Sequence, residues 1–257
     1  MPALCKRSFC GIEPKQKQAF RVAPPATDAD LARFQDLPPL VAQLLFNRGI
    51  QDPDAARAFL QDCVALGSPF LLKDMMKAVE RVRKAIRGGE QVAVYGDFDT
   101  DGVTATVLLV EVLTALGANA KPYIPHRVDE GYGLNLEALR HLYREGARVV
   151  ITVDCGIRSV EEVERASRGM DLIVTDHHSV GDELPPAVAV INPKQPGCPY
   201  PFKDLSGVGL AFKLAQALLQ VQARMAEPFG VAEDSLLDLV ALGTVADLVP
   251  LQGENRT

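Results

Sequence analysis

The stretch VAVYGDFDTDG, residues 92–102, decides the fold of this chain. Its first four residues are apolar and mostly β-branched or aromatic, which is typical of a buried strand. Three aspartates then alternate with other residues, and a glycine follows. From Val103 to Leu116, apolar residues recur at three- and four-residue spacing, which predicts a helix. A strand that runs directly into a helix begins a βαβ unit.

The same alternation continues to residue 191. Apolar runs predict further strands at 121–124, 149–153, 172–175 and 188–191, and periodic segments predict helices at 136–145 and 160–167. Right-handed crossovers between such strands give a parallel sheet that helices cover on both faces. We therefore expect an α/β fold, a parallel β-sheet flanked by helices, with further helices at 208–221 and 235–249.

The N-terminal part of the chain has a different pattern. Residues 1–36 are polar, proline-bearing and aperiodic, and we expect a loose leader there. Residues 37–88 contain short amphipathic patterns at 40–46, 54–59 and 73–86, and we expect a small helical appendage. The α/β domain then covers residues 89–257.

The composition is that of an ordinary globular protein of 257 residues, with 47% hydrophobic and 23% charged residues. Five scattered cysteines without a CxxC pair argue against a disulfide framework or a zinc knuckle. The sequence shows neither a signal peptide nor a membrane-spanning run, so we expect a cytoplasmic protein. A net charge of −6 gives no global electrostatic reason to bind nucleic acid.

Acidic residues and histidines follow three of the predicted strands. They are Asp97, Asp99 and Asp101 after the first strand, Asp154 after the third, and Asp176, His177 and His178 after the fourth. The carboxyl ends of parallel strands share one edge of a sheet, where ligands bind, so these side chains should converge. Crowded carboxylates repel one another unless a cation neutralises them. Carboxylate and imidazole suit Mg²⁺ or Mn²⁺, and this many ligands suit two ions that activate a water for attack on a phosphoester.

Each motif also has a simpler interpretation. The DxDxDG pattern matches the start of an EF-hand calcium loop, but the twelfth position from Asp97 is Leu108, where that loop needs a glutamate. Asp99 and Asp101 would also suit the nucleophile and acid of a haloacid-dehalogenase-like phosphatase. Asp154 alone would suit a helix N-cap or a turn. A consecutive histidine pair after an aspartate is harder to explain structurally.

Further site residues are predicted outside these strand ends. Asp247 lies in the apolar run LVALGTVADLVPL (239–251), where a buried carboxylate is costly unless it is paired or binds a metal, so we favour a ligand over a helix-end residue. Arg127 would suit a phosphate contact or an ordinary surface position. Ser206 and Gly207 precede a predicted helix, whose N–H groups would suit an anion. No GxGxxG or GxxxxGK[ST] motif is present.

Together these motifs resemble the DHH phosphoesterase superfamily, named for the triplet at 176–178, and within it the RecJ family of single-strand-specific 5′→3′ DNA exonucleases. The resemblance covers nearly all of the chain from residue 37. Its stretches are LPPLVAQLLFNRGIQDPDAARAFL (37–60), FLLKDMMKAVERV (70–82), VAVYGDFDTDG (92–102), YIPHRVDEGYGLN (123–135), ITVDCGI (151–157), IVTDHH (173–178), AVINPKQPGCPYP (189–201), LSGVGLAFKLAQAL (205–218) and LLDLVALGTVADLVPL (236–251).

The resemblance implies a role for each site residue. Asp97 and Asp99 would hold one metal ion, Asp101, His177 and Asp247 a second, and Asp154 would bridge both. His178 would contact the scissile phosphate, and Arg127 would assist. His126 stands where the family commonly carries asparagine, which leaves the local substrate contacts open.

The resemblance also implies an enzyme of DNA repair or recombination that uses two Mn²⁺ or Mg²⁺ ions. Its substrate would be single-stranded DNA, and a single-strand-binding protein or a helicase would be a partner. The family continues into C-terminal substrate-binding domains that we expect to be absent here, so the chain alone should bind DNA weakly and turn over slowly. Two alternatives stay open: a phosphoesterase for short oligonucleotides or cyclic dinucleotides, and a non-catalytic module of a replication scaffold.

Overall fold

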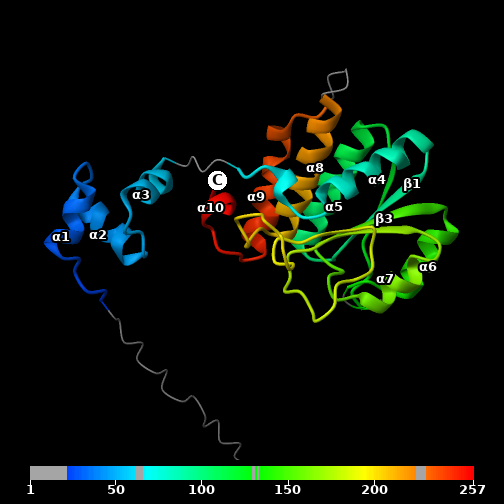
Figure 1. The fold of residues 1–257 in the computed structure, drawn as a ribbon, viewed down its shortest axis with the longest axis horizontal. Helices are drawn as coiled ribbons and strands as arrows, with labels where there is room; N and C mark the ends of the chain where they lie inside the picture. The colour runs from blue at the N-terminus through cyan, green and yellow to red at the C-terminus, as the bar shows by residue number, and fades with distance from the viewer. Residues whose placement is uncertain (1–21, 62–65, 129–130, 132, 224–229) are drawn as a thin grey trace, which may run out of the picture. The chain divides into compact units, whose positions relative to one another are not determined.

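The computed structural model describes residues 22–61, 66–128, 131, 133–223 and 230–257 (Figure 1). Predictions about residues 1–21, most of the expected leader, lie outside these ranges. The chain forms two compact units that divide after Gln61. Among the described helices, none combines the length and the apolar character that a membrane crossing requires.

The first unit is a small helical body. Its elements are α1 (Asp28–Leu31), η1 (Ala32–Phe34), α2 (Pro39–Asn47) and α3 (Pro53–Leu60). Thr27 and Asp30 form a capping box at the start of α1, and Asp52 caps α3. The apolar core of this body is Phe34, Ala42, Leu45 and Ala56. Residues 28–34 fall within the expected leader, but they are helical and contribute Phe34 to this core.

The second unit is built on five parallel strands in the order β2-β1-β3-β4-β5. The strands are β1 (Gln91–Gly96), β2 (Asn119–Tyr123), β3 (Ala147–Val153), β4 (Asp171–Thr175) and β5 (Ala189–Ile191). The helices up to the fourth strand are η2 (Pro69–Leu71), α4 (Met75–Gly88), α5 (Thr100–Ala115), α6 (Leu136–Arg144) and α7 (Val160–Ala166). The predicted α/β fold with a helix-flanked parallel sheet is confirmed.

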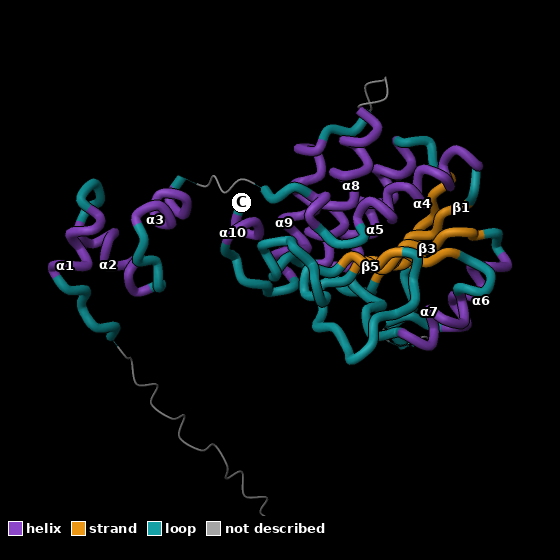
Figure 2. Tube along the Cα trace, in the orientation of Figure 1, coloured by secondary structure: helices purple, strands orange, loops and turns teal. Residues whose placement is uncertain are grey.

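Successive residues of a strand point to opposite helical layers, which Figures 1 and 2 show above and below the sheet. In β1, Val92 and Val94 pack in one core with α4, α5 and α8 (Gly207–Ala223). Ala93 and Tyr95 pack in a second core with α6 and α7. Strands β1, β3 and β4 are buried on both faces over most of their length, and they therefore read as apolar runs in the sequence.

Helix α4 belongs to the core of the second unit. Its residues Ala78, Val79 and Val82 are completely buried in the same apolar cluster as the sheet. The expected appendage, 37–88, is therefore divided between the two compact units. The division of the chain into a leader, an appendage and a catalytic domain stays a prediction, because compactness alone does not show that a segment folds by itself.

The direction in which strands are added to the sheet reverses at β1. Strand β1 pairs with β2 on one side and with β3 on the other. The chain therefore passes from β1 to one side of the sheet and later returns to the opposite side. Connections that diverge in this way leave room for a ligand at the carboxyl ends of the strands.

The remaining helices are α8, η3 (Glu233–Leu236), α9 (Leu237–Ala246) and α10 (Gly253–Arg256). A buried ion pair joins two of them, since Lys213 Nζ in α8 lies 2.7 Å from Glu254 Oε2 in α10. Lys213 also donates to the Gly67 carbonyl at 2.9 Å, and the Tyr200 hydroxyl donates to Glu254 Oε1 at 2.7 Å. The Lys213 and Glu254 side chains are only 2% and 5% exposed, so the pair depends on these hydrogen bonds to offset desolvation.

We expect Glu254→Ala to lower the free energy of unfolding by about 3–5 kcal/mol, because the Lys213 ammonium would stay buried without its counter-ion. Urea unfolding measures this loss. Glu137→Ala is the matched control, since it breaks an exposed pair with Arg140 and should cost about 1 kcal/mol or less. Equal costs for the two variants would contradict the prediction.

Candidate metal centre

Asp97 and Asp99 lie in the turn between β1 and α5. Asp97 is buried, and its Oδ1 accepts the Phe98 N–H at 2.7 Å. Asp99 is the N-cap of α5, and its Oδ1 accepts the Gly102 N–H at 2.9 Å. A Cβ at Gly102 would lie 2.5–2.7 Å from backbone atoms of Asp97, so this turn requires glycine. The motif connects a strand to a helix, which differs from the two-helix setting of an EF-hand loop.

Asp101 is buried in the first turn of α5 and faces the N-terminus of α8. Its Oδ2 accepts the Gly207 N–H at 2.6 Å, and its Oδ1 accepts the Val208 N–H at 2.7 Å. Burial raises the pKa of Asp101 to about 6, although these two hydrogen bonds act in the opposite direction.

Ser206 and Gly207 both have partners within the protein, and their predicted contact with a phosphate stays a prediction. The Gly207 N–H already binds the Asp101 carboxylate. Ser206 is completely buried, and its hydroxyl lies 2.8 Å from Thr244 Oγ1. The N-terminus of α8 attracts an anion, as its dipole predicts, but that anion is a side chain of the protein itself.

Asp154 follows β3 and is almost completely buried. Its φ of 61° is in the left-handed region, which costs about 1–2 kcal/mol for most residues and is better tolerated by aspartate. Burial raises the pKa of Asp154 to about 10, and repulsion from Asp101 and Asp99 adds to the shift. Only a nearby cation would keep such a carboxyl group ionised at neutral pH.

The two histidines after β4 have different surroundings. Burial, and next the neighbouring His178, lower the pKa of His177, so its ring is neutral at pH 7. His177 Nε2 lies 3.1 Å from Asp154 Oδ1 and 3.6 Å from Asp247 Oδ2. His178 is half exposed, and the hydrogen bond between its Nδ1 and Asp176 raises the pKa of His178 to about 9.

Asp176 orients this segment. Its Oδ1 accepts the His178 N–H at 3.0 Å, and its Oδ2 accepts the Ile157 N–H at 2.9 Å. Burial alone would raise the pKa of Asp176, but the hydrogen bonds from His178 and Ile157 outweigh burial, and the pKa is lowered. Asp176 is therefore an ionised support for His178.

Two further residues hold the histidines and were missed from the sequence. Asn192 Nδ2 donates to the His178 carbonyl at 2.9 Å, and Lys194 Nζ donates to the His177 carbonyl at 2.7 Å. Asn192 Oδ1 also accepts the Lys194 N–H at 2.8 Å. The Asn-Pro dipeptide after β5 was the available signal, since it marks a turn at the same edge of the sheet.

Asp247 reaches the site from the C-terminal end of α9, where it is the C-cap residue. The candidate ligands form three groups whose ligand atoms lie within 4.8 Å of one another. These are Asp97 with Asp99 and Asp154, Asp101 with His177 and Asp247, and Asp154 with His177 and His178. The structure therefore brings the six predicted ligands together, with Asp97 near Asp99 and with Asp101 near His177 and Asp247, as expected. Their roles as metal ligands stay a prediction.

The unsatisfied atoms of the site suit a divalent cation. Asp154 Oδ1, His177 Nε2 and Asp247 Oδ2 are buried and have no hydrogen-bond partner among the described residues. Asp154 Oδ1 and His177 Nε2 lie 3.1 Å apart, but their geometry is not that of a hydrogen bond. Buried unsatisfied polar atoms are costly, and one cation would satisfy all three. Their carboxylate and imidazole chemistry fits Mn²⁺ or Mg²⁺.

Arg127 stacks beside the first aspartates. Its guanidinium carbon lies 4.9 Å from the centroid of the Phe98 ring, and Phe98 is placed between Asp97 and Asp99. This cation–π contact restricts the exposed arginine. Its contact with a phosphate stays a prediction.

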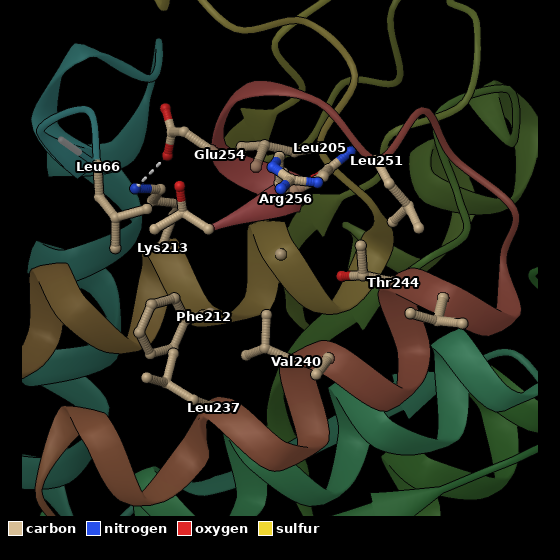
Figure 3. A pocket seen from close by; sticks show the side chains of 15 residues that line it. Leu66, Leu205, Phe212, Lys213, Leu237, Val240, Thr244, Leu251, Glu254 and Arg256 are labelled. Atoms are coloured by element: carbon tan, nitrogen blue, oxygen red, sulfur yellow. Dashed lines mark ion pairs between the residues drawn. The ribbon is translucent and has the colours of Figure 1, made fainter. Parts of the chain in front are cut away.

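An apolar pocket of 320 Å³ lies outside the metal centre, between α8 and α9 (Figure 3). Phe212, Leu237 and Val240 are among the side chains on its wall, and Lys213 and Glu254 also line it. None of the six predicted metal ligands lines this pocket. The pocket is therefore separate from the candidate metal centre.

A sequence model described as DHH family, N-terminal domain, matches residues 91–244, which include Asp97, Asp154 and the 176–178 triplet. The chain belongs to the DHH family. It is 49% identical over 220 residues to the single-stranded-DNA-specific exonuclease RecJ of Bacillus subtilis (strain 168), covering 85% of this chain and 27% of that protein. It is 42% identical over 231 residues to RecJ of Escherichia coli (strain K12), covering 86% of this chain and 39% of that protein.

Two solved structures share this fold. RecJ of Thermus thermophilus in complex with Mn²⁺ matches with a TM-score of 0.72 and 32% identity over 92% of this chain and 33% of that chain. An exonuclease RecJ bound to manganese matches with a TM-score of 0.63 and 39% identity over 72% of this chain and 46% of that chain. The chain spans less than half the length of these relatives. An activity of the full-length relatives can therefore only be proposed for this chain.

We expect the metal-free chain to lose stability as pH rises from 6.5 toward 9. The folded-state pKa of Asp154 is about 10 and that of His178 about 9, both above their ordinary values of about 3.9 and 6.5. In this window the folded state retains protons that the unfolded state has released, so stability falls, by up to ~1.4 kcal/mol per pH unit for each proton.

Urea unfolding in EDTA at several pH values measures this slope, and Asp154→Asn isolates the part due to one carboxyl group. Because the amide does not titrate, this variant should be more stable than the wild type at pH 8 and show a shallower slope. A slope that stays the same in Asp154→Asn would contradict the assignment to Asp154.

Proposed function

We propose that this chain is the catalytic core of a two-metal phosphodiesterase that degrades single-stranded DNA from its 5′ end. The observation that carries the proposal is the convergence of two ligand groups in one crevice, Asp97 with Asp99 and Asp154, and Asp101 with His177 and Asp247. The DHH-family relatives named above support the substrate, because they are single-stranded-DNA-specific exonucleases with 49% and 42% identity to this chain. The manganese-bound relatives support the metal.

In this proposal each ligand group holds one Mn²⁺ or Mg²⁺ ion, and Asp154 lies between the two. When bound, such ions lower the pKa of a water and polarise the phosphoryl oxygens. The protein supplies the preorganisation. Asp101 is fixed by two backbone N–H groups, and the neutral ring of His177 offers a nitrogen donor without first losing a proton.

His178 is proposed to contact the scissile phosphate. The hydrogen bond from Nδ1 to Asp176 keeps the ring oriented and favours its charged form, so the phosphate contact falls to Nε2. A charged imidazole donor stabilises the negative charge that develops on phosphate oxygens in the transition state. Asp176 thus acts on the reaction through His178.

The alternatives differ in what they require of the site. A non-catalytic scaffold module would not need the complete set of six carboxylate and imidazole ligands that converge here. A small-substrate phosphoesterase would need the same set, so only the substrate separates it from the exonuclease. A cytoplasmic location and a single-strand-binding or helicase partner stay predictions from the family resemblance.

The proposal is tested by hydrolysis of a 5′-phosphorylated single-stranded DNA in Mn²⁺ and in EDTA. We expect 5′-mononucleotides to be released only with Mn²⁺. Asp154→Ala should reduce the rate by more than ~100-fold, since even outer-shell changes around metals cost about 10–100-fold. Asp182→Ala, which changes an exposed aspartate outside the ligand groups, is the matched control.

The other outcomes are equally informative. Hydrolysis of a dinucleotide but not of a longer strand would favour the small-substrate phosphoesterase. Mn²⁺ binding without hydrolysis of either substrate would contradict the catalytic proposal and favour a binding module. Product release from the 3′ end would contradict the proposed polarity.

Arg127→Ala should lower kcat/KM by about 10–100-fold, because a charge-assisted hydrogen bond to phosphate contributes about 1.5–3 kcal/mol. Mn²⁺ affinity should change little, since Arg127 is not in any ligand group. Arg140→Ala, another exposed arginine, is the control. If Arg127→Ala is as active as Arg140→Ala, the phosphate contact is absent.

A further inference from the structure

The segment SGVG (206–209) at the start of α8 lies against Asp101, Asp154 and the helix that ends at Asp247. It resembles an anion-binding helix N-terminus, yet its first free N–H groups are taken by Asp101. Its remaining contacts reach Asp154, directly after β3, and Thr244 in α9. A segment that touches three ligand-bearing elements is placed to set their mutual distances.

The contact with Asp154 depends on the absence of a side chain at Gly207. A Cβ there would lie 2.6 Å from Asp154 Cβ and 2.7 Å from Asp154 Cγ and Oδ1. These distances are far below van der Waals contact, so any larger residue must displace the aspartate or the helix. The same residue whose N–H holds Asp101 thus also defines one wall of the Asp154 position.

The contact with α9 runs through two buried hydroxyl groups. Ser206 Oγ lies 2.8 Å from Thr244 Oγ1 and accepts the Gly209 N–H at 3.1 Å. Thr244 is three residues before Asp247, almost one helical turn. The Ser206–Thr244 contact therefore fixes the end of α9 from which Asp247 reaches the site.

A second close approach keeps α9 beside Asp101. A Cβ at Gly243 would lie 2.4 Å from Thr104 Oγ1, 2.8 Å from Val208 Cγ1 and 3.0 Å from Asp101 Oδ1. Helices α5, α8 and α9 consequently meet at the Asp101 carboxylate with no room for a side chain between them.

We propose that the SGVG segment and Thr244 are positioning residues that hold Asp101, Asp154 and Asp247 at metal-binding distances. The inference rests on the proposed metal site and adds the device that sets its geometry. It gives Ser206 and Gly207 a role toward the candidate metal ligands, in addition to the phosphate contact predicted for them. Misplaced ligands would bind the ions less tightly even where the fold is intact.

The test is calorimetric titration of the metal-free full chain with Mn²⁺, together with thermal unfolding in EDTA. Thr244→Val and Ser206→Ala each remove one hydroxyl and should weaken Mn²⁺ binding about tenfold, and their double variant should be little worse than either. Gly207→Ala should weaken it by about 100-fold. Thr244→Ser keeps the hydroxyl and should bind Mn²⁺ nearly as well as the wild type.

The control for Gly207→Ala is Gly88→Ala in α4, where a Cβ would meet only Glu90 atoms at 3.6 Å or more. A purely structural role predicts lower melting temperatures in EDTA with unchanged Mn²⁺ affinity, and that result would overturn the inference. Equal affinities of Thr244→Val and Thr244→Ser would overturn it as well, even if Gly207→Ala fails to fold.

Binding is measured without substrate, so the two proposals fail in different ways. A wild-type chain that binds Mn²⁺ but hydrolyses no DNA contradicts the exonuclease proposal, while the variant affinities still decide the positioning role. A wild-type chain that binds no Mn²⁺ overturns both, because there is then no metal site for these residues to position.

Discussion

The burial of several carboxyl groups in one crevice is the constraint on which the rest of the structure depends. Strands β1, β3 and β4 end at the same edge and bring Asp97, Asp101, Asp154 and Asp176 together with almost no contact with water. These carboxyl groups differ in the number of hydrogen bonds that they accept. Asp176 accepts from the backbone and ring of His178 and from Ile157, Asp101 accepts two backbone N–H groups, and Asp154 Oδ1 has no hydrogen-bond partner in the described part of the chain. This gradient separates a carboxylate with a supporting role from one whose ionisation depends on a cation.

Two helix N-termini reduce the electrostatic repulsion between these carboxylates. Asp99 caps α5 and Asp101 lies in its first turn, while the start of α8 donates to Asp101 from the other side. The positive ends of both helices therefore point at the acids. The net charge of −6 describes the whole chain and does not reveal this local arrangement. For that reason, an acidic composition is weak grounds for excluding a phosphodiester substrate.

The sequence was sufficient for the elements whose position follows from local patterning. Strands buried on both faces appear as apolar runs, and acids at their carboxyl ends must converge, so the approach of these side chains to one another was predictable. The partners of Ser206 and Gly207 within the protein were not predictable, because tertiary packing decides which group meets the N–H groups of a helix N-terminus. Asn192 and Lys194 were missed for a related reason: the Asn-Pro dipeptide signals a turn, but not that these side chains donate to the main-chain carbonyls of the histidines. The pattern of α4 predicted an apolar face, but not that the sheet would cover it.

Backbone strain and charge repulsion fall on the same few residues. Asp154 has a φ of 61°, and Leu248, directly after Asp247, has the same value although a glycine would adopt it with less strain. A glycine at 154 would relieve the backbone but remove the carboxylate, so the proposed ligand role of Asp154 gives a physical reason for the strain. Nothing in the described residues explains the leucine at 248, a residue that is 88% exposed. A cation that binds only the folded state would offset this cost, because its binding free energy adds to the free energy of unfolding. Metal affinity and the stability of the segments that carry the candidate ligands are therefore coupled. Without a cation, the site is therefore least stable at Asp154, the residue that the proposed reaction places between the two metal ions.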